Sequence, residues 1–359
     1  MQVKVDHQMK KILIVGEDLE IGRTEEVYGR GFSALGCEVQ HFSWREVTSS
    51  LSSGGLWNRV AWRLAWQLLA KSANSKLLEQ ANQFQPDLTL VISPRLVHPD
   101  TVLALQQKGL AFVFYTDNPV DAHHTHTNSW VKRGFPLWDA AFIWSEELVR
   151  RLMKNGVKQA FFHPFCSDVE YHFPQRQTNP IYDVAFIGNW DGSRKREQYL
   201  KAIADYRLGL WGSNYWNTHC QEVSLKGLCQ GMCSYQEIPQ ILGSAKMGLN
   251  ILRPQNEDGH NIRTYEIPAT GTLMLSERSQ ELLNLFVEDR EAVYFSNPDE
   301  LRQKVEYLLK NSDVMEVITE AGYQKALKNR ITDRVTEIAA IYEKIKFEQD
   351  NYLQPMHSQ

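Results

Sequence analysis

The 359-residue sequence lacks several features that would assign it to a broad class at once. It has no run of about 18 apolar residues, so we expect no membrane-spanning helix. Its first apolar run, residues 12–15, is too short for the core of a signal peptide. Basic residues are not in excess, since 39 Lys and Arg stand against 43 Asp and Glu. The net charge of −4 argues against a nucleic-acid partner held mainly by charge. We expect a cytoplasmic protein.

Cysteine is also scarce, and no CxxC pair occurs. The five cysteines are Cys37, Cys166, Cys220, Cys229 and Cys233. An odd number of cysteines favours reduced thiols. His219 beside the last three invites a zinc site, but their C-x8-C-x3-C spacing is not that of paired zinc ligands. Three histidines within residues 123–126 have no nearby carboxylate pair and favour a loop. We therefore expect no metal.

Ordinary composition, with 43% apolar and 23% charged residues, predicts a globular chain of about two domains. Short apolar runs alternate with helical patterns, which predicts parallel sheets covered on both faces. The expected strands are residues 11–16, 39–42, 87–93, 112–116, 140–144, 183–188, 208–212, 246–252, 273–276 and 292–295. The polar stretch 166–181 predicts the connection between two domains, 9–172 and 180–330. Helices follow to about residue 347, with breaks expected near Gly322 and Asn329.

Residues 29–34 match the dinucleotide pattern G-x-G-x-x-A. That pattern works at a strand-to-helix turn, whereas the nearest strand is expected to end near Gly16. We therefore interpret Gly29 and Gly31 as a glycine pair within or before the first helix. No P-loop, G-x-S-x-G or HExxH motif occurs.

Asp117 follows an apolar strand, residues 112–116, at the place where open parallel sheets bind ligands. It is a candidate for contacting a substrate, and a plain turn residue is the alternative.

The segment 258–271, DGHNIRTYEIPATG, is the most informative stretch. A helix starting near His260 would place Arg263, Glu266 and Thr270 on one face and aim backbone N–H groups at an anion. Arg263 could then hold a diphosphate, and the Glu266 carboxylate could accept from two ribose hydroxyls. The alternative is an Arg263–Glu266 ion pair on a solvated face.

The helix expected over 56–70 carries aromatic and basic residues on one face. These are Arg59, Trp62, Arg63 and Trp66. They predict an acceptor-binding surface or a peripheral contact with anionic lipid, and packing under another helix is the alternative.

The segments 183–200, 245–252, 258–277 and 291–311 together resemble the CgeB-like, group 1 glycosyltransferases. The resemblance covers about 180–330 and extends more loosely to the first half. It implies the GT-B fold: two Rossmann-like α/β domains with parallel sheets facing a central cleft. It also implies that a C-terminal helix, within 331–350, crosses back to the first domain.

The resemblance further implies a role for individual residues. In these families two acids eight residues apart serve the donor, and Asp258 and Glu266 occupy those places. Glu266 then binds the donor ribose, and Asp258, shorter than the usual Glu, lies near the sugar or the diphosphate. Arg263 is the first candidate for the diphosphate, followed by Arg194 and Arg196. The remaining expected donor contacts are Gly188, Asn261 and Thr270.

The resemblance thus implies a metal-independent transferase that moves a sugar from a nucleotide diphosphate to an unknown acceptor, with retention at the anomeric carbon. Asp117 and Asp258 are its expected catalytic residues. No cofactor is expected beyond the UDP, GDP or dTDP sugar itself. The alternatives are a non-catalytic nucleotide-sugar binding or surface-layer or spore-coat assembly protein, and a nucleotide-sugar epimerase of the same fold.

Overall fold

The structure is a computed structural model that describes residues 9–45, 58–121, 127–256 and 258–353. The side chains of residues 58–68, 255, 352 and 353 are outside that description. The chain divides into two compact units, residues 1–164 with 331–359 (unit 1) and residues 165–330 (unit 2). Within the described residues, every helix is too short or too polar to span a bilayer.

Unit 1 is built on a parallel sheet in the order β2-β1-β3-β4-β5-β6. The strands are β1 (Lys11–Gly16), β2 (Glu38–Ser43), β3 (Leu88–Ile92), β4 (Leu110–Tyr115), β5 (Ala140–Ile143) and β6 (Ala160–Phe162). Every residue of β3, β4 and β5 is buried, as expected for central strands covered on both faces.

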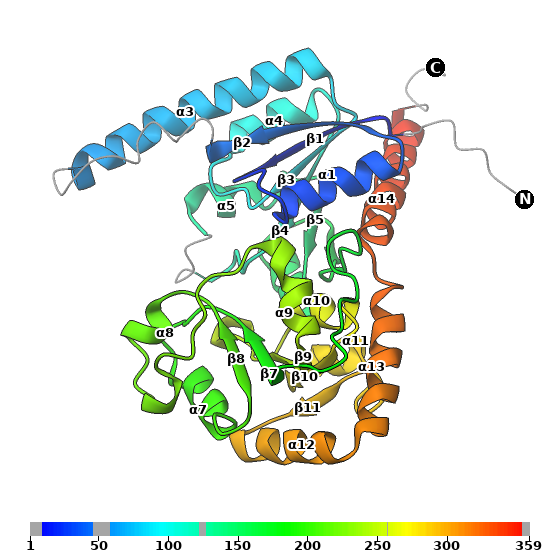
Figure 1. Cartoon of the computed structure of the whole chain (residues 1–359). Helices are drawn as coiled ribbons and strands as arrows, with labels where there is room; N and C mark the ends of the chain where they lie inside the picture. The colour runs from blue at the N-terminus through cyan, green and yellow to red at the C-terminus, as the bar shows by residue number, and fades with distance from the viewer. Residues whose placement is uncertain (1–8, 46–57, 122–126, 257, 354–359) are drawn as a thin grey trace, which may run out of the picture. The chain divides into compact units, whose positions relative to one another are not determined.

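The helices of unit 1 come from both ends of the chain (Figure 1). They are α1 (Thr24–Ala34), α3 (Asn58–Phe84), α4 (Pro99–Gln106), α5 (Ser129–Gly134), α6 (Glu146–Lys154) and α14 (Ile331–Leu353). The last of these packs beside α1, where Gly31 lies against Ile331 and Val335. Gly29 and Gly31 thus lie inside α1, which confirms that they are not a dinucleotide turn.

Unit 2 repeats the design with the parallel order β11-β10-β9-β7-β8. The strands are β7 (Tyr182–Ile187), β8 (Leu208–Trp211), β9 (Ala245–Asn250), β10 (Leu273–Glu277) and β11 (Val293–Phe295). Two clusters of buried apolar side chains, built from residues of the sheet and the surrounding helices, form its core. The predicted fold class, two parallel-sheet α/β domains, is confirmed.

The α-helices of unit 2 are α7 (Arg194–Ala202), α8 (Tyr215–Thr218), α9 (Ile238–Gly243), α10 (Arg263–Ala269), α11 (Gln280–Leu285), α12 (Pro298–Lys310) and α13 (Ser312–Ala326). Short 3₁₀ turns are η2 (Val223–Leu225), η3 (Tyr235–Glu237) and η4 (Pro254–Asn256). Residues 166–181, expected as a connection, belong to unit 2, which begins at Phe165. Ser167 Oγ donates to Ala326 O and Asn329 O, and Gln177 N donates to Gly243 O.

One predicted helix break is absent, and one strand was not predicted. The helix break expected at Gly322 is absent, because α13 runs through that residue. A Cβ at Gly322 would lie 2.4 Å from Glu291 O, so the glycine allows close packing instead of ending the helix. The edge strand β6 was not predicted, since it holds only three half-buried residues.

Candidate functional site

Both sheets place a topological switch point beside their first strand. In unit 2, β7 pairs with β8 on one side and β9 on the other, and in unit 1, β1 lies between β2 and β3 in the same way. Successive connections therefore leave in opposite directions and open a crevice beyond the carboxyl ends of these strands. These two places are where a ligand is expected.

Backbone contacts hold together the loops that follow β7 and β8. Gly188 N donates to Trp211 O at 2.9 Å, and Trp216 Nε1 donates to Gly188 O at 2.8 Å. A Cβ at Gly212 would lie 2.3 Å from Gly188 O. Gly188 therefore lies at the predicted strand end, in a backbone-lined corner with no room for a side chain at Gly212.

Arg196 braces this corner from inside unit 2. Its guanidinium is buried and donates to Asn189 O at 2.7 Å and to Ile251 O at 2.9 Å. Burial lowers the pKa of Arg196 to about 10, against the opposing effect of nearby Asp191. The structure thus gives Arg196 a positioning role between the ends of β7 and β9, where the sequence had suggested a donor contact.

The other two basic residues at the start of α7 are more accessible. Arg194 is exposed, and Lys195 Nζ lies 2.7 Å from Glu277 Oε1 at the end of β10. The second carboxylate oxygen of Glu277 accepts from Leu252 N at 3.0 Å. Sequence reasoning missed Lys195, although the basic triplet 194–196 directly after a strand was a usable signal.

Arg263 and Glu266 come together on the first turn of α10. Arg263 Nε donates to Ile187 O at 3.2 Å, and its Nη1 forms an ion pair with Glu266 Oε2. The Glu266 side chain is only 1% exposed, and its Oε1 lies 4.0 Å from Nε2 of buried His172. Burial lowers the pKa of Arg263. The ion pair given as the alternative therefore exists, but Glu266 is buried and Arg263 half-buried, so the pair does not lie on a solvated face.

The helix that carries this pair begins at Arg263 and not near His260. His260 is fully buried, where its Nδ1 contacts Glu281 Oε1 and its Nε2 accepts from Phe165 N at 3.2 Å. The expectation of a helix N-terminus at His260 was therefore wrong, because these two contacts fix the residue in the preceding loop.

Asn261, on the loop before α10, lies beside the end of β9. Its Nδ2 donates to Asn250 Oδ1 at 2.8 Å, and Asn250 Nδ2 donates to Ser276 Oγ at 3.2 Å. Within the described part of the chain, the buried Asn261 Oδ1 has no hydrogen-bond partner. A buried acceptor left open in this way can serve a ligand donor.

The other two predicted donor residues of this segment lie in contrasting surroundings. Asp258 is exposed on the loop before α10. Thr270 is fully buried, and its hydroxyl donates to Ile267 O at 2.7 Å. Thr270 thus closes the end of α10, and its contact with a donor stays a prediction.

In unit 1, Asp117 is half-buried just beyond β4, at the carboxyl edge of the sheet. The three histidines within 123–126 lie outside the described residues. The backbone of α3 is helical from Asn58, but the side chains expected to bind the acceptor are outside the description. They are Arg59, Trp62, Arg63 and Trp66, and their role stays a prediction.

A cavity that sequence reasoning missed lies at the switch point of unit 1. One part, of about 260 Å³, is lined by residues that follow β1, β2 and β3. They are Glu17, Asp18, Arg23, Trp44, Arg45, Arg95 and Leu96. A second part, of about 170 Å³, shares the first three of these and adds Thr24, Glu25, Ile92, Ser93 and Thr116. Its place at the strand ends makes it a candidate ligand site.

Two features of this cavity are unusual. Ser93 has φ of 55°, a left-handed conformation that is strained for a non-glycine residue, and its Oγ lies 2.6 Å from Thr116 Oγ1. Glu25 is buried and its Oε1 accepts from Glu17 N at 2.7 Å. Burial raises the pKa of Glu25 against the effect of its backbone hydrogen bonds. Strain and a buried carboxyl at one cavity are typical of functional sites.

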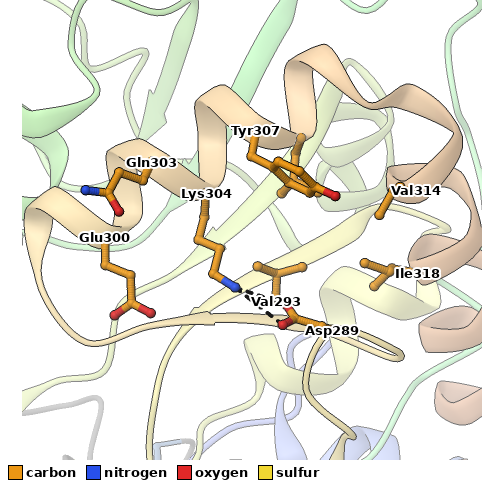
Figure 2. A pocket seen from close by; sticks show the side chains of 9 residues that line it. Asp289, Val293, Glu300, Gln303, Lys304, Tyr307, Val314 and Ile318 are labelled. Atoms are coloured by element: carbon orange, nitrogen blue, oxygen red, sulfur yellow. Dashed lines mark hydrogen bonds and ion pairs between the residues drawn. The ribbon is translucent and has the colours of Figure 1, made fainter.

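A further cavity, of about 600 Å³, lies in unit 2 between β11, α12 and α13 (Figure 2). Val293, Val314 and Ile318 line it, and Lys304 Nζ reaches Asp289 Oδ1 at 3.1 Å. It contains none of the predicted site residues, so it is separate from the residues expected to bind a donor. Among the described residues, no group of three or more His, Cys, Asp or Glu side chains could hold a metal ion.

Comparison with known proteins finds a family model that matches part of the chain. Residues 194–340 match a family described as "Glycosyl transferase-like". No curated protein matches the chain.

Solved structures match over nearly the whole chain at low identity. Sucrose-phosphate synthase from Thermosynechococcus elongatus is 11% identical, with a TM-score of 0.70 over 94% of this chain and 100% of that one. A glycosyltransferase from Rickettsia africae is 13% identical, with a TM-score of 0.66 over 94% and 98%. Anabaena HepE in complex with UDP-glucose is 10% identical, with a TM-score of 0.64 over 95% and 99%. The chain therefore has the GT-B fold of glycosyltransferases, and its residues 194–340 match a glycosyl transferase-like family.

Proposed function

We propose that the protein is a glycosyltransferase that moves a sugar from a nucleotide diphosphate to an acceptor, with unit 2 binding the donor and unit 1 the acceptor. One observation carries the proposal. Asn261 and Arg263, predicted from sequence to serve a donor, contact the ends of β9 and β7, and Glu266 pairs with Arg263. All three lie inside the segment that matches the glycosyl transferase-like family. A relative by fold, HepE, is described in complex with UDP-glucose.

In this proposal Glu266 accepts hydrogen bonds from the donor ribose, and Arg263 contacts the diphosphate. Because Glu266 is covered and paired with Arg263, donor binding requires the guanidinium to turn from the carboxylate toward the phosphates. Arg194 and Lys195, at the start of α7, add positive charge beside the same strand end. Asp258, on the exposed loop, reaches the sugar or the diphosphate.

The reaction breaks the bond between the anomeric carbon and the diphosphate oxygen and forms one to an acceptor hydroxyl oxygen. The electron pair leaves with the nucleoside diphosphate, where arginine and lysine stabilise its charge, and the hydroxyl proton is released. We further propose retention at the anomeric carbon and no need for a metal ion. Asp117 is our candidate for contact with the transferred sugar or the acceptor. A link to CgeB-like proteins and a role in glycan synthesis at the inner membrane face belong to the same proposal.

Calorimetry with UDP, GDP and dTDP tests the donor assignment. Glu266→Ala is expected to weaken binding of the preferred nucleotide by about 10- to 100-fold, since hydrogen bonds to a charged group contribute about 1.5–3 kcal/mol each. Unchanged affinity in this variant would remove Glu266 from the ribose.

Two arginine variants test the diphosphate contact. Arg263→Ala and Arg194→Ala should each weaken the nucleoside diphosphate more than the nucleoside, and equal losses would argue against a phosphate role. Arg302→Ala is the matched control, because Arg302 is an ion-paired arginine of unit 2 on α12. Release of nucleotide only when acceptor is present separates transfer from epimerisation, and tight donor binding without turnover would favour a binding protein.

A further inference from the structure

The cavity at the switch point of unit 1 contains three arginines, and each of them faces a carboxylate. Arg95 Nη2 lies 3.1 Å from Glu17 Oε1, and Arg45 Nη1 pairs with Asp18 Oδ2. Arg45 Nη1 also lies 3.2 Å from Glu20 Oε1. The other carboxylate oxygen of Glu20, Oε2, lies 3.8 Å from Arg23 Nη2. Three positive charges are thus matched by three negative charges, although the cationic residues come from three separate loops.

Backbone hydrogen bonds hold the Asp18 carboxylate and the loop that carries Glu17. Asp18 Oδ1 accepts from Leu19 N at 2.8 Å, and its side chain is only 15% exposed. Arg45 N and Ser43 Oγ both donate to Glu17 O, at 3.2 and 3.1 Å, which ties the loop after β1 to the end of β2. The Asp18 carboxylate and the main chain of Glu17 are therefore fixed beside the arginines by the chain's own hydrogen bonds.

This pairing determines which groups the cavity accepts. An anionic group would have to displace a carboxylate from an arginine and remain beside it, at a cost in repulsion. A hydroxyl-rich neutral group can instead donate to the carboxylates and accept from the guanidinium groups, with Trp44 as an apolar wall. The 260 Å³ part is smaller than the ~300–1,000 Å³ of drug-sized pockets, and suits a single sugar residue.

We propose that this cavity binds a neutral, hydroxyl-rich group of an acceptor, one sugar unit in size, and that Glu17 and Asp18 exclude phosphorylated or carboxylated acceptors by occupying the arginines. That the bound group belongs to an acceptor rests on the proposed function. The preference of the cavity for neutral over anionic groups can be measured without turnover.

The anion arm of the test uses inorganic phosphate, titrated into the full-length protein by calorimetry. Glu17→Gln removes the carboxylate charge beside Arg95, and Asp18→Asn removes one of the two carboxylate charges beside Arg45. Each variant should tighten phosphate binding about fivefold over the wild type, the upper range of an exposed ion pair. Adding Arg95→Gln to Glu17→Gln should abolish the gain. Asp205→Asn is the matched control, because it frees Arg302 on an exposed surface of unit 2.

Equal gains in Asp205→Asn and Glu17→Gln would overturn the proposal, because any released arginine would then behave alike. No gain in either cavity variant, with melting curves that show a folded protein, would overturn it too.

The neutral arm uses saturation-transfer NMR with glucose, galactose, mannose, N-acetylglucosamine and glucose 6-phosphate. At least one neutral sugar should bind the wild type and lose signal in Arg95→Gln, and the phosphorylated sugar should not compete with it. Tighter binding of the phosphorylated sugar, or no neutral sugar bound, refutes the inference. If a neutral sugar binds while no nucleoside diphosphate does, the donor proposal fails and this one stands.

Discussion

At the scale of single residues, close backbone contact explains why glycine occupies position 212 in unit 2. Gly188 and Gly212 directly follow the neighbouring strands β7 and β8. Gly212 has no space for a Cβ, because the carbonyl oxygen of Gly188 would lie 2.3 Å away. The loops that follow these strands include Asn189 and Ser213, which are joined by a 2.9 Å hydrogen bond. The geometry of the proposed donor site therefore depends on Gly212, which has no side chain to contact a ligand.

We expect Gly212→Ala to destabilise the protein by about 1–3 kcal/mol, the usual cost of overpacking. It should also weaken nucleoside diphosphate binding, because the ends of β7 and β8 must separate. Denaturant unfolding and calorimetry measure the two effects. Gly134→Ala is the control, since its nearest heavy atom would be Trp138 Nε1 at 3.4 Å, and it should stay within about 0.5 kcal/mol. Equal losses in both variants would contradict the expectation.

At the scale of elements, the C-terminal helix α14 covers a buried histidine of unit 1. His163 Nε2 lies 2.7 Å from Tyr28 Oη of α1, and its Nδ1 lies 3.6 Å from Glu337 Oε2 of α14. Burial, with a smaller effect from the charge of Arg334, lowers the pKa of His163 to about 3. The imidazole is thus neutral where α1 and α14 meet.

This histidine should make unit 1 sensitive to acid. In the unfolded chain His163 regains its ordinary pKa near 6.5, so its contribution to stability is complete above that pH and falls as the pH drops toward 3. At pH 5 the loss is about 2 kcal/mol. Chemical unfolding of His163→Phe, compared with the wild type from pH 7 to pH 5, should show a shallower decline.

Tyr28→Phe separates titration from hydrogen bonding in that experiment. It removes the same hydrogen bond but keeps the imidazole, so it should shift the stability by a constant amount at each pH. A pH slope in His163→Phe that equals the wild-type slope would show that this imidazole does not carry the acid sensitivity.

Elements were predictable from sequence where the signal is local. The strands β1, β3 and β4 are continuous apolar runs that end in polar or turn residues, so their buried character is visible in the sequence. The strand β6 escaped because three half-buried residues carry no period. The helix break expected at Gly322 was wrong because that glycine makes room for the carbonyl oxygen of Glu291. Glu291 is distant in sequence, so this contact has no local signal.

The same distinction applies to the sites. Arg263 and Glu266 are three residues apart, and helical spacing was enough to pair them. The unit 1 cavity joins residues from the loops after β1, β2 and β3, and only the folded sheet brings Glu17 to Arg95. Likewise, nothing local distinguishes Arg196, whose guanidinium is used inside unit 2, from exposed Arg194.

At the scale of the whole molecule, two units with separate cores should respond separately to a ligand. A nucleoside diphosphate that binds only folded unit 2 stabilises that unit, by about 2.7 kcal/mol at a hundredfold excess over Kd. Hydrogen exchange with saturating UDP or GDP should therefore show the strongest protection in residues 187–191 and 250–266. Protection confined to β1 and β3 would place the nucleotide in unit 1 and contradict the proposal that unit 2 binds the donor.

The path of the chain has a practical consequence for recombination. Because α14 returns to unit 1, the whole of unit 2 is one uninterrupted stretch, residues 165–330, inserted between two parts of unit 1. A donor specificity could be exchanged by replacing that cassette at its two junctions, whereas a fusion at a single crossover would leave α1 against a foreign C-terminal helix. A protease cut at the first junction, between residues 164 and 165, would leave α14 on the fragment that carries unit 2. The packing of α14 on α1 would then still hold the two fragments together.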